Sequence, residues 1–131
     1  KKIKYIKKNE RFNENMKFRI TNAVKCLPPQ NKPNLEELKN CNKFLSSEVK
    51  GMKNLKIILT LGLIAHQSVL RVFKKKNSDF KFKHLFVHQL DKTTKMLNSY
   101  HCSKYNISTK RLSLIEFEKV FFKLDKELVN F

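Results

Sequence analysis

Apolar residues in this chain recur in short runs whose spacing alternates between that of strands and that of helices. Over Phe18–Val24 they fall at alternate positions, and the run stops before Pro28 and Pro29, which cannot continue a hydrogen-bonded ladder. This pattern predicts a buried strand over 18–24. A continuous apolar run over 56–61, ended by Gly62, predicts another strand, covered on both faces, and a tight turn.

Two helices are predicted from capping boxes, in which a polar residue with a short side chain precedes a glutamate by three positions. Asn34 with Glu37 begins a helix that should run to about residue 50, and Ser113 with Glu116 begins a terminal helix. Residues 63–73 have helical spacing, which predicts a helix directly after the glycine turn. Further strands are predicted near 85–88 and over 95–100, and a basic loop over 74–83.

Strands that alternate with helices predict an α/β fold with a parallel sheet, in which ligands bind at the carboxyl ends of the strands. The 131 residues allow one domain, with a basic lead-in over 1–17 and a core over 18–131. Two polar loops that follow strands, 25–33 and 101–112, are therefore where function is expected. His101 opens the second loop, which is dense in polar groups and is predicted to contact phosphate or substrate.

A net charge of +18 suggests a polyanionic partner, but the kind of charge limits this inference. Of the 29 basic residues 25 are Lys, and 13 Asn accompany them, a bias that coding DNA rich in A and T produces. Charge dominated by Lys indicates diffuse attraction to phosphate at most. The longest apolar stretch, over 57–65, is far shorter than the ~20 residues that cross a bilayer. We expect no membrane association and a cytoplasmic location.

Several classes of site are excluded or disfavoured by the residues present. Two glycines in the whole chain exclude a glycine-rich phosphate loop, and neither a Ser-His-Asp order nor an HExxH pattern occurs. The odd number of cysteines does not form a disulfide framework. Cys26 and Cys41, fifteen residues apart, taken alone are more often packing residues than metal ligands. The remaining histidines, His66, His84 and His88, are interpreted as structural.

Three segments together resemble the uracil-DNA glycosylases of the iron-sulfur type, closest to family 5 and similar also to family 4. They read ITNAVKCLPPQNKPNLEELKNCNKFL over 20–45, LTLGLIAHQSVL over 59–70 and SYHCSKYNISTKRLS over 99–113. Their order and spacing fit the family from about residue 18 to 122. The resemblance implies a three-layer α/β/α sandwich with a short, mostly parallel sheet, incomplete at the N-terminus. It also implies a DNA repair enzyme that flips out uracil, or a related deaminated base, and hydrolyses its N-glycosidic bond.

The resemblance also implies roles for individual residues. Asn22 matches a polar position that faces the uracil ring, and His101 matches the histidine that stabilises negative charge on the departing uracil. Cys26 and Cys41 match two of the four ligands of a 4Fe–4S cluster. Loop residues complete the set: Ser103 and Asn106 near the abasic nucleotide, Arg111 at the arginine before the last helix, and, on charge grounds only, Lys104 and Lys110 as phosphate contacts.

The chain departs from the family pattern at three positions. Cys102 stands where the family has a proline, Lys110 replaces a glycine, and the family's Phe-x-His-Gly reads Phe82-Lys83-His84-Leu85, with leucine for glycine. Each replacement is expected to affect loop geometry.

The family's N-terminal half, which carries the other two cluster cysteines and the first motif, is not matched, so the chain is expected to be a C-terminal part. We expect a monomer that binds uracil-containing DNA. The alternative is a catalytically inactive remnant that at most binds DNA, and a small RNA-binding protein ranks last. Apolar surface is expected to be exposed where the unmatched half should pack.

Overall fold

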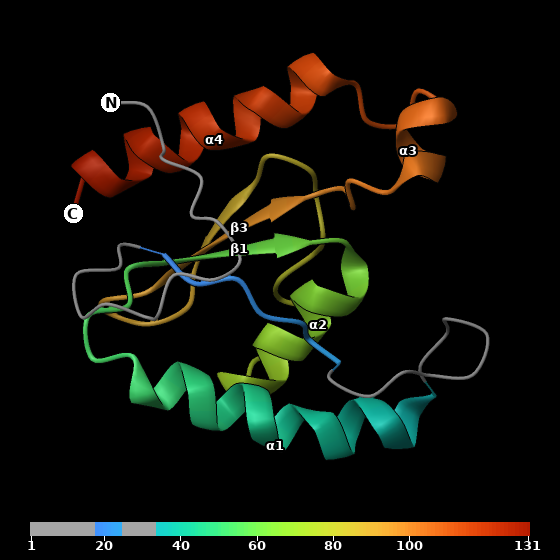
Figure 1. Ribbon diagram of the computed structural model, residues 1–131. Helices are drawn as coiled ribbons and strands as arrows, with labels where there is room; N and C mark the ends of the chain where they lie inside the picture. Colours follow the sequence, from blue (N-terminus) through green and yellow to red (C-terminus); the bar gives the residue numbers. More distant parts are fainter. Residues whose placement is uncertain (1–17, 25–33) are drawn as a thin grey trace, which may run out of the picture.

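A computed structural model describes residues 18–24 and 34–131, in which helices alternate with short strands (Figure 1). Figure 1 shows three layers, with α1 and α2 on one face of the sheet and α4 on the other. The chain therefore folds as the predicted α/β/α sandwich. The elements follow the order α1 (Leu35–Gly51), β1 (Ile57–Leu61), α2 (Leu63–Val72), β2 (Val87–Gln89), β3 (Lys95–Ser99), α3 (Lys104–Ser108) and α4 (Leu114–Val129).

The sheet of the described residues has the strand order β1-β3-β2. β1 and β3 are parallel, with Ile57 opposite Lys95 and Leu61 opposite Ser99. β2 pairs antiparallel with β3, so that Val87 lies opposite Leu97. Because β1 and β3 are parallel, their carboxyl ends lie at one edge of the sheet (Figure 1). At this edge α2 begins directly after β1, and the loop to α3 begins directly after β3.

The main core lies between the sheet and the two helices α1 and α2. Its buried residues are Leu45 of α1, Val69 and Leu70 of α2, Leu90 directly after β2, and Met96 of β3. Because side chains alternate along a strand, Leu97 faces the other side, where Val120 of α4 is also fully buried. At the far end of α4, Lys95 forms an ion pair with Glu127 (2.9 Å). Each face of the sheet is thus covered by apolar side chains.

Both predicted capping boxes are present. The Asn34 side chain accepts from the Glu37 amide at 2.7 Å and the Glu37 carboxylate accepts from the Asn34 amide at 2.9 Å. Ser113 and Glu116 form the same pair of hydrogen bonds, at 3.1 and 2.8 Å. These reciprocal bonds satisfy amides that a helix start otherwise leaves unpaired, so α1 and α4 begin at the predicted residues.

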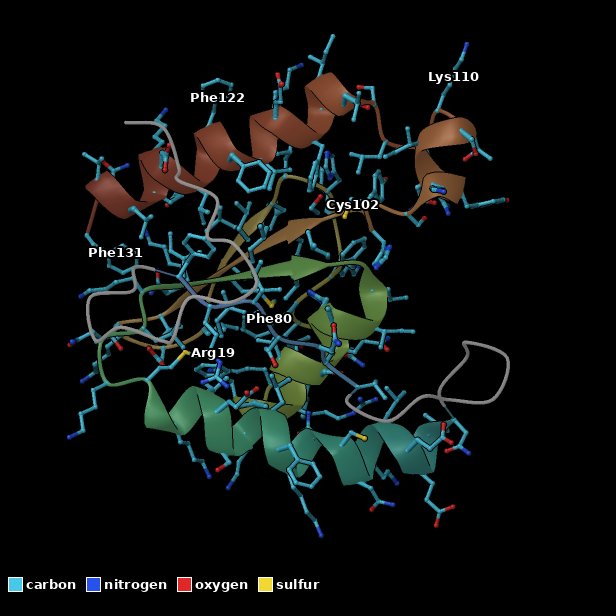
Figure 2. The ribbon with its side chains drawn as sticks, in the orientation of Figure 1. Arg19, Phe80, Cys102, Lys110, Phe122 and Phe131 are labelled. Carbon is cyan, nitrogen blue, oxygen red and sulfur yellow. The ribbon has the colours of Figure 1, made fainter. Side chains whose placement is uncertain are left out.

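The predicted strand over 18–24 is wrong. This segment has no regular secondary structure, and the side chains of Phe18 and Ile20 are 42% and 86% exposed. Alternating apolar residues form a strand only beside a partner that completes the ladder, and no strand of the described residues pairs with this segment. Side chains fix it instead, because Arg19 and Thr21 bind the two carboxylate oxygens of Glu48 on α1, at 2.6 and 2.8 Å. Figure 2 shows Arg19 beside α1.

Two further details differ from the predictions. The sheet is mixed, because a turn over 90–94 joins β2 to β3 and is too short for a crossover between parallel strands. In that turn Asp91 accepts hydrogen bonds from the amides of Thr93 and Thr94, both at 2.8 Å, which hold the pKa of its carboxyl below the usual range. The second difference is that the polar loop over 101–112 contains the short helix α3.

Large apolar side chains are exposed on the described part of the chain. Phe122 of α4 points away from the sheet (Figure 2) and is 72% exposed, and Val129 is 83% exposed. No helix in the described ranges has the length and apolar character that crossing a membrane requires. The predicted basic lead-in over 1–17 and the polar loop over 25–33 lie outside the described residues.

Candidate functional site at the carboxyl ends of the parallel strands

Gly62 and His101 bring the carboxyl ends of β1 and β3 into contact. The Gly62 amide donates to the Ser99 carbonyl at 2.8 Å, and a Cβ placed on Gly62 would lie 3.3 Å from the Cβ of His101. The Gly62 backbone has φ 94° and ψ 169°, a region that only glycine occupies readily. A side chain at this turn would therefore be strained and would press against His101.

The loop after β3, residues 101–112, is held by its own polar side chains and is called the His101 loop below. The side-chain nitrogen of Asn106 donates a hydrogen bond to the His101 carbonyl at 2.7 Å. The Ser103 hydroxyl caps α3 by accepting a hydrogen bond from the backbone amide of Asn106 at 3.2 Å. The Asn106 carbonyl in turn accepts from the amide of Leu112, whose side chain is fully buried. Ser103 and Asn106 therefore fix the loop, while the His101 side chain is exposed at its start.

Cationic residues surround this loop. Lys104, Lys110 and Arg111 are all exposed, and Figure 2 shows Lys110 extending away from the body of the protein beside α3. The Arg111 guanidinium lies 5.8 Å from the centre of the Tyr100 ring, one residue before His101. Cys102 is half-buried at the base of the loop, between β3 and α3 (Figure 2). The structure thus gathers six of the predicted residues on one segment together with Cys102: His101, Ser103, Lys104, Asn106, Lys110 and Arg111.

The other predicted residues are not gathered there. Asn22 is exposed on the segment that Glu48 holds against α1, and no hydrogen bond among the described residues joins it to the His101 loop. Cys41 is 1% exposed on α1, and Cys26 lies outside the described residues. In this part of the chain no three His, Cys, Asp or Glu side chains group closely enough to hold a metal ion. The described residues therefore do not by themselves form a cluster site.

A buried polar network below the loop was not predicted. The Asn98 side-chain oxygen of β3 accepts from the Thr60 hydroxyl of β1 at 2.7 Å and lies 3.0 Å from His66 Nδ1. His66 Nε2 lies 2.7 Å from the Phe80 carbonyl, which can only accept, so Nε2 carries a proton. All three side chains are at most 2% exposed. The sequence signal was a polar residue inside each apolar strand, near a histidine on the intervening helix.

Two departures from the family pattern fall at unusual backbone conformations. Leu85 and Lys110, which the resemblance matches to family glycines, have φ values of 59° and 57°, in the left-handed region that favours glycine. Both positions therefore have a backbone conformation suited to glycine. Lys110 lies directly before Arg111, so its conformation sets the direction in which the loop enters α4.

Lys110→Gly is expected to raise the free energy of unfolding by about 0.5–1 kcal/mol, because relief of the left-handed strain exceeds the added entropy of the unfolded chain. Denaturant titration measures this change. The matched control is Lys119→Gly, an exposed lysine inside α4, which should lower stability by about 1 kcal/mol because glycine disfavours helix. A loss of stability in both variants would contradict the account.

Two depressions on the described surface lie elsewhere. The larger, of about 430 Å³, is an open depression along α1 lined by Lys39, Lys43 and Lys50 with neighbouring polar residues. The other, of about 220 Å³, lies between the end of α1 and the β2–β3 turn. Neither depression is lined by a residue of the His101 loop.

These features define an α/β/α protein with an exposed, cationic histidine loop at the carboxyl ends of two parallel strands. Residues 3–125 match the model of the uracil DNA glycosylase superfamily. The chain belongs to this superfamily, as the resemblance of its motifs predicted.

Three curated relatives, each named "Type-5 uracil-DNA glycosylase", support this assignment. The protein of Thermus thermophilus is 34% identical over 79% of this chain and 48% of its own length. That of Pyrobaculum aerophilum is 34% identical over 72% of this chain and 40% of its own length. That of Mycobacterium bovis is 30% identical over 84% of this chain and 42% of its own length. The chain thus spans less than half the length of these relatives.

Proposed function

We propose that this protein is a DNA repair glycosylase that removes uracil, or a related deaminated base, from DNA. The observation that carries the proposal is the His101 loop, exposed and internally bonded at the carboxyl ends of β1 and β3, in a chain related to type-5 uracil-DNA glycosylases. This edge of a parallel sheet is where α/β proteins bind ligands.

In the proposed reaction, a water oxygen bonds to C1′ of the deoxyribose and the bond from C1′ to N1 of uracil breaks. The electron pair of that bond leaves with uracil, and the water proton passes to solvent. An imidazole N–H of His101 donates a hydrogen bond to the uracil oxygen on which negative charge develops. The exposed position of His101 gives a flipped base access to this N–H.

The remaining site residues bind DNA in this proposal. Lys104, Lys110 and Arg111 contact phosphates near the flipped nucleotide, and Asn22 pairs with the edge of uracil that distinguishes it from cytosine. Because phosphate contacts release counterions, the affinity for DNA should fall steeply as the salt concentration rises. Ser103 and Asn106 keep the loop in shape beside the abasic nucleotide.

The test uses protein produced from the complete gene and a labelled duplex that carries one uracil. Strand cleavage at the uracil position after alkali reveals the abasic site that the enzyme leaves, and retardation of the duplex in a gel measures binding separately. Cleavage at uracil and not at cytosine is the expected result. Binding without cleavage would identify the inactive DNA-binding alternative and overturn the enzymatic proposal.

We also propose that Cys26 and Cys41 supply two of four ligands to a 4Fe–4S cluster. The burial of Cys41 supports this, because a cluster thiolate shielded from solvent is protected from oxidation. Protein from the complete gene, purified without oxygen, should be brown and contain about four iron atoms per chain, and Cys41→Ser should lower that iron content. Colourless, iron-free wild-type protein would contradict the assignment.

A further inference from the structure

His84 contacts the residue that precedes His101 in two ways. Its ring stacks on the ring of Tyr100, with centroids 4.7 Å apart and planes 4° from parallel. Its Nδ1 accepts a hydrogen bond from the Tyr100 backbone amide at 3.1 Å. Tyr100 is the last residue before the loop, so His84 holds the backbone at the point where the chain leaves β3.

The hydrogen bond to Tyr100 fixes the protonation state of His84. An Nδ1 that accepts carries no proton, so the neutral ring has its hydrogen on Nε2. That Nε2 atom is buried and has no hydrogen-bond partner among the described residues. The ring is therefore held by its Nδ1 contact and its stacking rather than by a second polar partner.

We propose that His84 is a positioning residue, whose neutral ring holds the Tyr100 amide and thereby sets the direction of His101, and that protonation of His84 releases this hold. The part of this inference that concerns uracil release rests on the proposed function. A protonated Nδ1 is a donor and would face the donor N–H of Tyr100, so the two groups would repel one another.

The groups packed around the ring decide when this happens. Burial lowers the pKa of His84, and the Glu116 carboxylate of α4 opposes that effect without cancelling it. Glu116 is itself held ionised, since hydrogen bonds from Ser113 lower its pKa. The Arg111 guanidinium lies 5.8 Å from the centre of the Tyr100 ring, on which His84 stacks. The Phe82 ring also contacts the Tyr100 ring, with the ring centroids 6.1 Å apart.

The sign of the pH effect follows from the lowered pKa. The folded protein binds fewer protons at His84 than the unfolded chain, so stability should decrease as the pH falls below the ordinary histidine value of about 6.5. The hydrogen bond to Tyr100 should be intact at neutral pH and lost at acid pH. Uracil release should show an acid limb with the same midpoint.

The experiment compares two replacements of His84 that separate the hydrogen bond from the stacking. His84→Phe keeps an aromatic ring but has no acceptor, whereas His84→Asn keeps an acceptor near the position of Nδ1 and cannot titrate. The backbone amide signals of Tyr100, Cys102 and Ser103 are followed by NMR between pH 5 and 7.5. Uracil release is measured over the same range with protein from the complete gene.

In the wild type the three amide signals should shift together, with a midpoint below pH 6.5. In His84→Asn they should not titrate, and uracil release should keep most of its rate while losing this acid limb. In His84→Phe the Tyr100 amide should lose its hydrogen-bonded shift at every pH, and release should fall about tenfold, the effect of losing one positioning contact. The matched control is His88→Phe, because His88 is also partly buried with a lowered pKa but bonds to Lys81 instead of Tyr100.

Wild-type amide signals that do not change with pH, or a His84→Phe protein with an unchanged Tyr100 amide, would overturn the inference. The His88→Phe control keeps His84 and should titrate like the wild type, so a loss of the hydrogen-bonded Tyr100 shift in this control would also overturn the inference. The NMR result does not depend on catalysis. A wild type that releases no uracil while its Tyr100 amide follows His84 would therefore refute the proposed function and leave the positioning role intact.

Discussion

His101→Ala is expected to lower the rate of uracil release by a factor of about 10²–10³, the loss that removal of one well-placed donor to a developing oxyanion produces. The His101 side chain is exposed, and the loop is fixed through the His101 carbonyl and Asn106, which alanine preserves. Stability should therefore change little. Single-turnover release from a uracil duplex, with thermal unfolding alongside, measures both quantities.

The control for His101→Ala is Glu118→Ala, which changes an exposed residue on α4 away from the loop and should leave the release rate unchanged. A His101→Ala protein that releases uracil at the wild-type rate would remove His101 from the reaction. A large loss of stability in His101→Ala would instead contradict the description of the loop as held by its backbone and Asn106.

Gly62→Ala is expected to lower the free energy of unfolding by about 2–4 kcal/mol, and to lower uracil release as well. The positive φ of Gly62 lies in a region that strains any side chain, and the added Cβ would lie 3.3 Å from His101. Strain at the edge formed by β1 and β3 should slow uracil release by Gly62→Ala even at temperatures where this variant remains folded. Denaturant unfolding and single-turnover release provide the two measurements.

Gly51→Ala supplies the matched control for this substitution. Gly51 ends α1 with no positive φ, and a Cβ there would meet no atom within 4 Å. Alanine should therefore stabilise the protein by about 0.5–1 kcal/mol through its helix preference. If Gly62→Ala and Gly51→Ala have similar stabilities, the close contact between Gly62 and His101 does not constrain the site.

The helix starts could be predicted because their signals are local. Asn34 and Ser113 each bond to a glutamate three residues away, so the information for the start of α1 and of α4 lies within one helical turn. The strand before Gly62 was likewise marked by a continuous apolar run and a residue suited to a tight turn. The edge of the sheet that carries His101 followed from these elements.

What could not be predicted depends on partners distant in the sequence. The alternation of apolar residues over 18–24 carries no information on whether a neighbouring strand exists. The segment is bound instead by Glu48, which lies 27 residues beyond Thr21 in the sequence. The network of Thr60, His66 and Asn98 and the stack of His84 on Tyr100 join residues up to 38 positions apart. The sequence around His66 and His84 indicated that both histidines are structural, but it did not indicate which residues they contact.

The net charge could not predict the position of the candidate site, because the basic residues are spread over the surface. Lysines line the depression along α1 as well as the His101 loop, so a surface with a charge of +18 attracts phosphate at many places. The position of the candidate site comes from Gly62, His101 and Asn106, whose contacts define one exposed loop.

The most direct test of the central claim is the amount of free uracil released, measured by mass spectrometry, when excess protein from the complete gene acts on a duplex with one uracil. We predict one free uracil and one abasic site per duplex, and none from a duplex that carries cytosine at that position. Protein that binds the duplex yet releases no uracil over many hours would contradict the assignment of glycosylase activity.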